Sequence, residues 1–303
     1  MARSATSPGK SSSGGERIIP RILQFFALIS ILTTFGIILT LFTETFRFFG
    51  EVSILEFLTD PQWTPSFKPQ HFGILPLLVG TLLITGIALV IAIPIGLGSA
   101  IYLSEYASDE IRRLVKPVLE VLAGIPTIVY GYFALNFITL QILRPLFPEI
   151  SIYNALSAGI AVGIMIIPMV SSLSEDAMSA VPRSLRQGAF ALGATRLEVS
   201  TRVVVPAALS GIVSSFVLAF SRAIGETMIV TVAAGASPNL TLNPLESVQT
   251  MTAYIVQVAT GDIAHGGIVY RSVFAVGTTL FLITLASNLL AQYITSKFRE
   301  EYE

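Results

Sequence analysis

The chain contains no cysteine, and this absence excludes disulfides, thiolate metal sites and cysteine nucleophiles. Histidine is almost as scarce. The two histidines, His71 and His265, lie far apart in polar connecting segments, and no carboxylate-rich helix accompanies them. Because protein metal sites combine several such ligands, the sequence predicts no metal site on this chain.

Charge is also in short supply. Only 12% of the 303 residues are charged, whereas an ordinary soluble domain carries about 25%. Hydrophobic residues make up 53% of the chain, and the mean hydropathy is +0.76. A chain this long and this poor in charge cannot cover a water-facing surface, so the composition predicts an integral membrane protein.

The N-terminal segment 1–16 is rich in serine and glycine and poor in apolar residues, and we expect it to be a disordered cytoplasmic tail. Its Gly9-Lys10-Ser11 stretch is reminiscent of a phosphate-binding loop. That motif needs a glycine five positions before Gly9, where Ser4 stands instead, and no strand precedes it. The tail is therefore not an ATP site.

A bilayer core requires about 20 apolar residues per helix. Six stretches meet this requirement, at 22–43, 74–104, 121–143, 153–173, 207–235 and 272–296. The second contains helix breakers such as Gly86 and Pro94, so we expect it to be tilted or kinked. The pattern predicts an all-α domain of six transmembrane helices over residues 17–303.

The distribution of lysine and arginine predicts the orientation. Thirteen of the 18 lie before the first span, in the loops between spans 2 and 3 and between spans 4 and 5, or after the last span, and four lie in the other loops. Because cytoplasmic loops carry the excess of positive charge, both termini should be cytoplasmic. The long outer segments 44–73 and 236–271 could cap the bundle or form a docking platform for a delivery protein.

The cytoplasmic segment 183–206 is too polar to span a membrane and too apolar for a plain solvated loop. Residues 183–200 have helical character, with apolar residues near one side. These residues are Leu185, Ala189, Leu192 and Leu197. Such a helix could rest on the membrane surface or occupy a groove of a partner protein.

This segment resembles the cytoplasmic signature of permeases from binding-protein-dependent ABC importers, which is E-A-A, three residues, Gly, nine residues, then I-x-L-P. The matching positions are Gln187, Gly188, Ala189, Gly193, Val203, Val205 and Pro206. Two positions depart from the signature, since Gln187 replaces the acidic residue and Gly188 replaces the first alanine. The resemblance implies a coupling segment whose small residues let a short helix seat closely in an ATPase.

Two ionisable residues, Arg222 and Glu226, lie at depth within the six predicted spans. Each costs about 2.5–3.5 kcal/mol at mid-helix. They are four residues apart, so on one helix they share a face and can pair. Arg222 would lie about 24 Å along a helix from Pro206 at 1.5 Å per residue. The pair could be structural, or it could be a relay point for an anion, because arginine offers a planar fork of donors to phosphate oxygens.

Four stretches resemble the PstC-type permeases of phosphate ABC importers, in the same order along nearly the whole chain. They are Trp63-x-Pro65, 72–82 (FGILPLLVGTL), 124–131 (GIPTIVYG) and 221–228 (SRAIGETM). The resemblance implies a type I ABC importer permease with MetI-like architecture, in the inner (plasma) membrane of a prokaryote. It also implies that Arg222 and Glu226 are needed for phosphate passage.

The same resemblance implies the partners. They are a second, PstA-like permease, two PstB-like ATPase subunits that carry ATP and magnesium, and an external PstS-like phosphate-binding protein. This chain would form half of the pathway within membrane lipid, hydrolyse nothing itself, hold no cofactor and bind no nucleic acid. Gly124 and Pro126 should produce a kink in span 3, either for packing or beside the pathway.

Three alternatives remain at this point. A permease for another oxyanion, such as sulfate, molybdate or phosphonate, would share the coupling segment. A secondary anion transporter would have more ionisable residues at the midplane and no docking helix. An intramembrane enzyme would need a base or nucleophile pair at depth, which the spans do not offer beyond Arg222 and Glu226.

Overall fold

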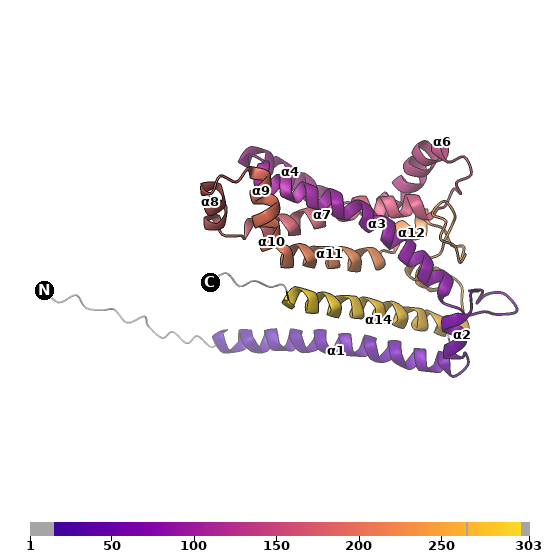
Figure 1. Ribbon diagram of the computed structural model, residues 1–303. Coiled ribbons are helices and arrows are strands. Elements are labelled where there is room, and N and C mark those ends of the chain that lie inside the picture. The colour runs from indigo at the N-terminus through magenta and orange to yellow at the C-terminus, as the bar shows by residue number, and fades with distance from the viewer. Residues whose placement is uncertain (1–14, 265, 298–303) are drawn as a thin grey trace.

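A computed structural model describes residues 15–264 and 266–297 of the chain, and these residues form helices without a named strand. Four helices are long and apolar enough to cross a membrane: α1 (Gly15–Phe49), α3 (Leu75–Ile101), α7 (Ala155–Ser179) and α14 (Ile268–Lys297). Two bent helix pairs in the described residues raise the number of candidate spans to as many as six, if each pair is one broken span (Figure 1). The chain is therefore a multi-pass membrane protein, and its four to six candidate spans agree with the six predicted.

Span 3 is broken where the sequence contains Gly124-Ile125-Pro126. Helix α4 (Asp109–Gly124) meets the next helices at 87°. These are α5 (Thr127–Phe133), the π-helix η2 (Ala134–Leu143) and α6 (Arg144–Leu146). Ile125 is extended (ψ 130°) because the residue before a proline avoids the helical region. The predicted kink is thus a full break, and the helix on the N-terminal side of it begins at Asp109, before the predicted start of the span at 121.

Span 5 is broken as well, although we expected one helix over 207–235. Helix α11 (Leu209–Ile224) ends before Gly225, and α12 (Met228–Ala233) begins after Thr227. The helices before α11 lie at 72° to it, so Pro206 does not belong to the same straight helix. The estimate of about 24 Å between Pro206 and Arg222 assumed one straight helix, and the bend before α11 contradicts that assumption.

The core of the bundle is the contact between α3 and α7, which is built from small residues (Figure 1). A Cβ atom on Gly159 would lie 2.6 Å from Ile87 Cγ2, and one on Gly163 would lie 3.0 Å from the Ala88 carbonyl oxygen. Glycine at these positions lets the two backbones approach closely, which is how membrane helices gain packing energy without a hydrophobic drive. Helices α11 and α12 pack against α7 and complete this core.

A second cluster lies at the end of the molecule where α1 leads into α2 (Ile54–Thr59), which we call the α2 end. Its rings meet edge to face and come from Phe48, Phe57, Trp63, Phe72 and Tyr254. Tyr254 belongs to α13 (Met251–Thr260), and burial raises its pKa to about 12. The long segments 44–73 and 236–271 therefore pack together as a cap, which is one of the two roles considered for them.

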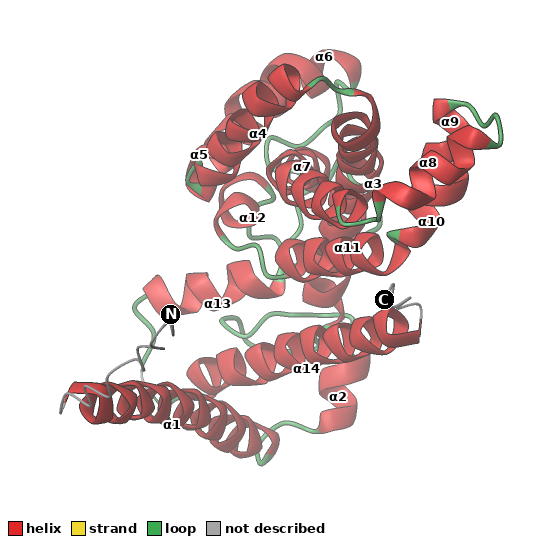
Figure 2. Cartoon of the chain, turned by 90° about the vertical axis from the view of Figure 1, so that its left-hand side faces the viewer, coloured by secondary structure: helices red, strands yellow, loops and turns green. Residues whose placement is uncertain are grey.

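The opposite end of the molecule carries the segment 183–206, together with the start of α1 and the end of α14, and we call it the α8 end (Figure 1). Figure 2 shows that its helices α8, α9 and α10 project from the bundle. Helix α1 begins at Gly15, inside the predicted tail, and residues 1–14 lie outside the described part of the chain.

Candidate functional site

The segment 183–206 folds as two short helices joined by a turn, rather than as the single helix that we expected. Helix α8 (Arg183–Ala191) is followed by a turn at Gly193, whose φ of +85° is the left-handed conformation that favours glycine. Gly193 therefore makes this turn within the chain, and the predicted close seating of its surroundings against an ATPase stays a prediction. The chain continues as α9 (Arg196–Val199), the π-helix η3 (Ser200–Val204) and α10 (Val205–Ala207).

The turn places the apolar residues of this segment on different helices, so they do not form one face. Ala189 packs against the interior, whereas Leu192 is 91% exposed at the end of α8 and Leu197 is exposed on α9. A Cβ atom on Gly188 would meet nothing within 4 Å. Open space and exposed leucines leave this surface available to a partner, and Gln187 also lies here, lining a cavity. Pro206 lies further on, in the single turn of α10 that precedes α11.

A capping box fixes the start of α9. The Thr195 hydroxyl accepts a hydrogen bond from the Glu198 backbone N–H, and the Thr195 backbone N–H donates to the Glu198 carboxylate at 2.9 Å. The bonds from Thr195 hold the pKa of Glu198 below its ordinary value. The segment therefore has a defined local structure even though much of it is exposed.

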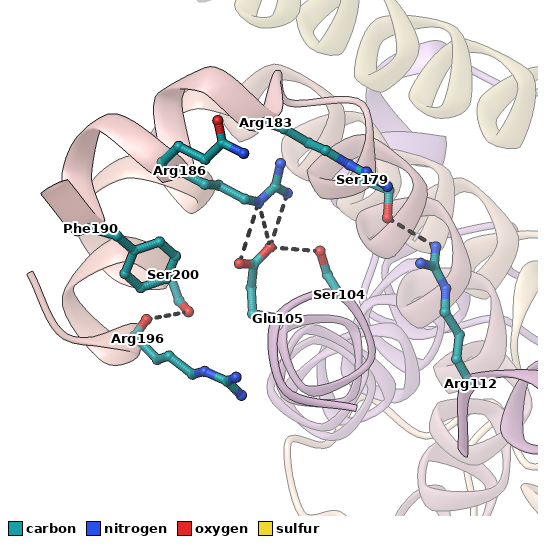
Figure 3. Close-up of a pocket in the computed structure, with 10 residues that line it drawn as sticks. Ser104, Glu105, Arg112, Ser179, Arg183, Arg186, Phe190, Arg196 and Ser200 are labelled. Carbon is teal, nitrogen blue, oxygen red and sulfur yellow. Dashed lines mark hydrogen bonds and ion pairs between the residues drawn. The ribbon is translucent and has the colours of Figure 1, made fainter. Parts of the chain in front are cut away.

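A polar cavity of about 430 Å³ separates this segment from the bundle (Figure 3). Four arginines line it, namely Arg112, Arg183, Arg186 and Arg196. Across the cavity, Arg186 pairs with Glu105 of the π-helix η1 (Tyr102–Tyr106), which continues α3. This pair was not predicted from the sequence, because its members are 81 residues apart and Glu105 lies just beyond the predicted end of span 2 at residue 104.

Arg222 and Glu226 lie at the break between α11 and α12. Arg222 is in the last turn of α11 and its side chain is 51% exposed, whereas that of Glu226 is 3% exposed. Their charged groups are 4.0 Å apart, and Arg222 Nη2 also donates to the Met165 sulfur at 3.5 Å. The two residues are therefore neighbours, as expected, but Glu226 lies beyond the end of the helix and the pair is loose.

Backbone groups hold the Glu226 carboxylate in place. Its Oε1 accepts from the backbone N–H groups of Met228 at 3.1 Å and Ile229 at 3.3 Å. Its own carbonyl oxygen accepts from the Thr252 hydroxyl at 2.7 Å. Glu226 thus caps α12, a role that the sequence did not predict, and this leaves Oε2 directed to Arg222.

The break at Gly124 and Pro126 belongs to the neighbourhood of this pair. Pro126 starts α5, and α5 packs closely on α12, since a Cβ atom on Gly131 would lie 3.2 Å from Ile229 Cα. The structure therefore connects the two broken spans directly, and the carboxylate of Glu226 caps the helix at their contact. A Cβ atom on Gly124 would meet nothing within 4 Å, so its own role is in the break and not in packing.

A further buried carboxylate was missed. Glu175 is fully buried in α7 and pairs with Arg112 and Lys116 of α4. Span 4 was expected to end at residue 173, but α7 continues to Ser179 and carries Glu175 inside the protein. The signal in the sequence was the presence of cations at 112 and 116, but only the folded chain brings them to this carboxylate.

Solved structures of ABC transporters share this fold. The permease of a bacterial ABC transporter that imports the acidic polysaccharide alginate matches with a TM-score of 0.62, at 16% identity, over 94% of this chain and 100% of that one. The inward-facing MetNI methionine ABC transporter matches with a TM-score of 0.56, at 17% identity, over 75% of this chain and 95% of the other. The fold is that of an ABC importer permease.

Sequence comparison then identifies the family. The family model described as "Binding-protein-dependent transport system inner membrane component" matches residues 92–300, and the chain belongs to this family. The "Probable ABC transporter permease protein YqgH" of Bacillus subtilis is 34% identical over 81% of this chain and 79% of its own length. The "Phosphate transport system permease protein PstC" of Haemophilus influenzae is 32% identical over 94% of both chains. The prediction of a transport permease, and not an enzyme, is confirmed.

Proposed function

We propose that this chain is the permease subunit of an ATP-driven phosphate importer, in which it forms one half of the translocation pathway. Relatives named as phosphate transport permeases from Haemophilus influenzae and Mesorhizobium japonicum support this proposal, at 32% and 33% identity. The observation that carries it is the half-exposed guanidinium of Arg222 beside the buried carboxylate of Glu226. A cation in this position is available to an oxyanion.

The geometry of the pair suits a transient anion site. At 4.0 Å, Glu226 offsets the charge of Arg222 when no anion is present but does not occupy its donors. Arginine then offers its planar fork to the phosphate oxygens. Two backbone N–H groups keep Glu226 in position as an anion arrives and leaves. Its free oxygen can accept a hydrogen bond from a protonated phosphate oxygen, which a fully ionised oxyanion lacks.

The segment 183–206 is the proposed docking site for the ATPase. Its exposed Leu192 and the open space at Gly188 fit a protein groove. Docking there places the α8 end, and with it both termini, in the cytoplasm of a prokaryotic cell whose plasma (inner) membrane holds the complex. The other partners are a second, PstA-like permease, two PstB-like ATPases with ATP and magnesium, and a PstS-like binding protein at the α2 end.

Uptake of radiolabelled phosphate tests the role of the pair. In a strain that lacks this gene, wild type should restore uptake, whereas Arg222→Gln should reduce it at least about tenfold, equivalent to about 1.4 kcal/mol. Glu226→Gln should also impair it, and Arg21→Gln, at an exposed arginine near the start of α1, should behave as wild type. Immunoblots of membranes would control for protein level. Normal uptake with Arg222→Gln would contradict the proposal.

Competition and energy dependence separate the alternatives. Excess unlabelled phosphate should abolish uptake, whereas sulfate, molybdate and phosphonate should not. In proteoliposomes, uptake should require ATP and persist when a protonophore collapses the proton gradient. Efficient competition by sulfate would favour a different oxyanion permease, and uptake driven by the gradient alone would favour a secondary transporter.

Docking can be tested by co-purification with the ATPase. Gly193→Asp places a side chain at a left-handed position and should release the ATPase from detergent-solubilised complexes. Leu192→Asp should do the same without disturbing the turn, because Leu192 is exposed. Leu242→Asp, at an exposed leucine of segment 236–271, is the matched control and should retain the ATPase. Retention by both Gly193→Asp and Leu192→Asp would refute the docking site.

A further inference from the structure

The helix that carries the docking surface has little direct packing on the bundle. No residue of α8 is buried, and the cavity of about 430 Å³ lies between it and the rest of the protein. Among the described residues, one ion pair joins α8 to another part of the chain, that of Arg186 with Glu105. Apart from the backbone on either side of α8, a force applied to this helix therefore reaches the bundle mainly through the Arg186 side chain and the weaker apolar contact of Ala189.

Arg186 joins α8 to η1 and to the end of α7. It lies on α8, and its Nη2 donates to Glu105 Oε1 of η1 at 3.0 Å. The same nitrogen donates to the carbonyl oxygen of Met178, in the last turn of α7, at 2.7 Å, and Nη1 donates to that of Val181 at 2.5 Å. The Arg186 side chain is 17% exposed and that of Glu105 8%, so solvent screens the pair weakly.

We propose that Arg186 and Glu105 form the positioning link that transmits movement of the segment 183–206 to the span α3–η1. The inference rests on the proposed function, because it assumes that an ATPase moves α8. A guanidinium with fixed donor directions holds the relative orientation of the elements that it joins, which a flexible ammonium does not. The same link fastens α8 to the end of α7, so α3 and α7, the core of the bundle, respond together.

Arg183 provides a matched control within the same site. It lies on the same helix and lines the same cavity, but within the described residues it takes part in no ion pair. Removing its charge changes the cavity without changing the link. A general effect of positive charge in the cavity would therefore appear in Arg183→Ala, whereas an effect of the link would appear only in variants of Arg186 or Glu105.

The test uses the full complex in proteoliposomes, with phosphate-loaded binding protein added outside. Arg186→Ala and Glu105→Gln should retain the ATPase on co-purification, but stimulation of ATP hydrolysis by the binding protein should fall at least about tenfold, and less phosphate should be taken up per ATP. Arg183→Ala, which leaves the pair of Arg186 and Glu105 intact, should lower the stimulation clearly less than Arg186→Ala does. The exchanged pair Glu105→Arg with Arg186→Glu should recover part of the coupling. Unchanged stimulation in Arg186→Ala, or loss of the ATPase from that variant, would overturn the inference.

A distance measurement tests the link independently of the proposed substrate. The chain has no cysteine, so spin labels at Ser184→Cys on α8 and Tyr106→Cys on η1 report one distance. On addition of ATP and vanadate this distance should stay constant in the otherwise wild-type complex and change in Arg186→Ala. A change in both would refute the link whatever the substrate, whereas an absence of phosphate uptake by wild type would refute the proposed function alone.

Discussion

Two buried carboxylates in this protein are surrounded in opposite ways. Both oxygens of Glu175, at the α8 end of α7, are engaged, by Arg112, Lys116 and the Ser179 hydroxyl. Within the part of the chain that the structure describes, Glu226 pairs with one cation, Arg222, which lies 4.0 Å away and is half exposed. Glu175 is therefore compensated at close range by two cations, as a structural carboxylate is. In the pair at 222 and 226 the guanidinium is half exposed and makes no close contact with the carboxylate, an arrangement that suits a site for a passing anion.

The largest stability effect should come from Glu175→Ala. Removing one member of a buried pair costs about 3–5 kcal/mol, and we expect the lower end because Arg112 and Lys116 are each about a third exposed. The apparent melting temperature of the detergent-solubilised protein would measure this. Asp176→Ala is the control, since Asp176 is 61% exposed, and it should change little. If the two variants unfolded at the same temperature, the ion pairs of Glu175 would not be the stabilising ones in this comparison.

Glu226→Ala should have a smaller effect, about 1–2 kcal/mol, because it removes the cap of α12. Glu226→Gln keeps an oxygen at this position and should melt close to wild type while transport is impaired. Melting curves recorded beside uptake assays would check both. Full uptake by the glutamine variant would show that the carboxylate acts only as a cap.

Arg222→Gln should have the smallest effect on stability, below about 1 kcal/mol. The Arg222 guanidinium is half exposed and 4.0 Å from the carboxylate, and an ion pair screened in this way contributes little. Its effect on uptake should nevertheless be the largest of the three. A fall in melting temperature as large as that of Glu175→Ala would place Arg222 among the structural ion pairs and remove the difference on which the proposal depends.

The sequence predicted the elements whose signal is local. The six apolar stretches and the polar segment 183–206 follow from composition, and Gly124 with Pro126 indicates a break because proline restricts the residue before it. The break after Ile224 has a weaker signal, since the apolar pattern continues through it, and the Thr252 contact that holds it comes from another part of the chain.

Residues that act through distant partners could not be predicted in this way. Glu105 and Arg186 meet only because α8 folds back beside the end of α3, and Glu175 meets its cations only because α4 turns by 87°. Arg222 and Glu226 were identified because charge is rare in apolar spans, but their distance and unequal exposure required the folded chain. The free-energy cost of a charge inside a membrane span identifies these two residues in the sequence, but it does not predict the distance between them or their exposure.

The π-helix η1 determines which side of its span Glu105 faces. A π turn accommodates one residue more than an α turn, so residues after it are rotated relative to a continuous α-helix. Since each residue of an α-helix advances by about 100°, the side that Glu105 faces depends on the number of residues between 102 and 106. Loss of one residue there would rotate the carboxylate away from Arg186 while leaving the composition almost unchanged. The length of this stretch is therefore as much a functional parameter as the identity of any side chain in it.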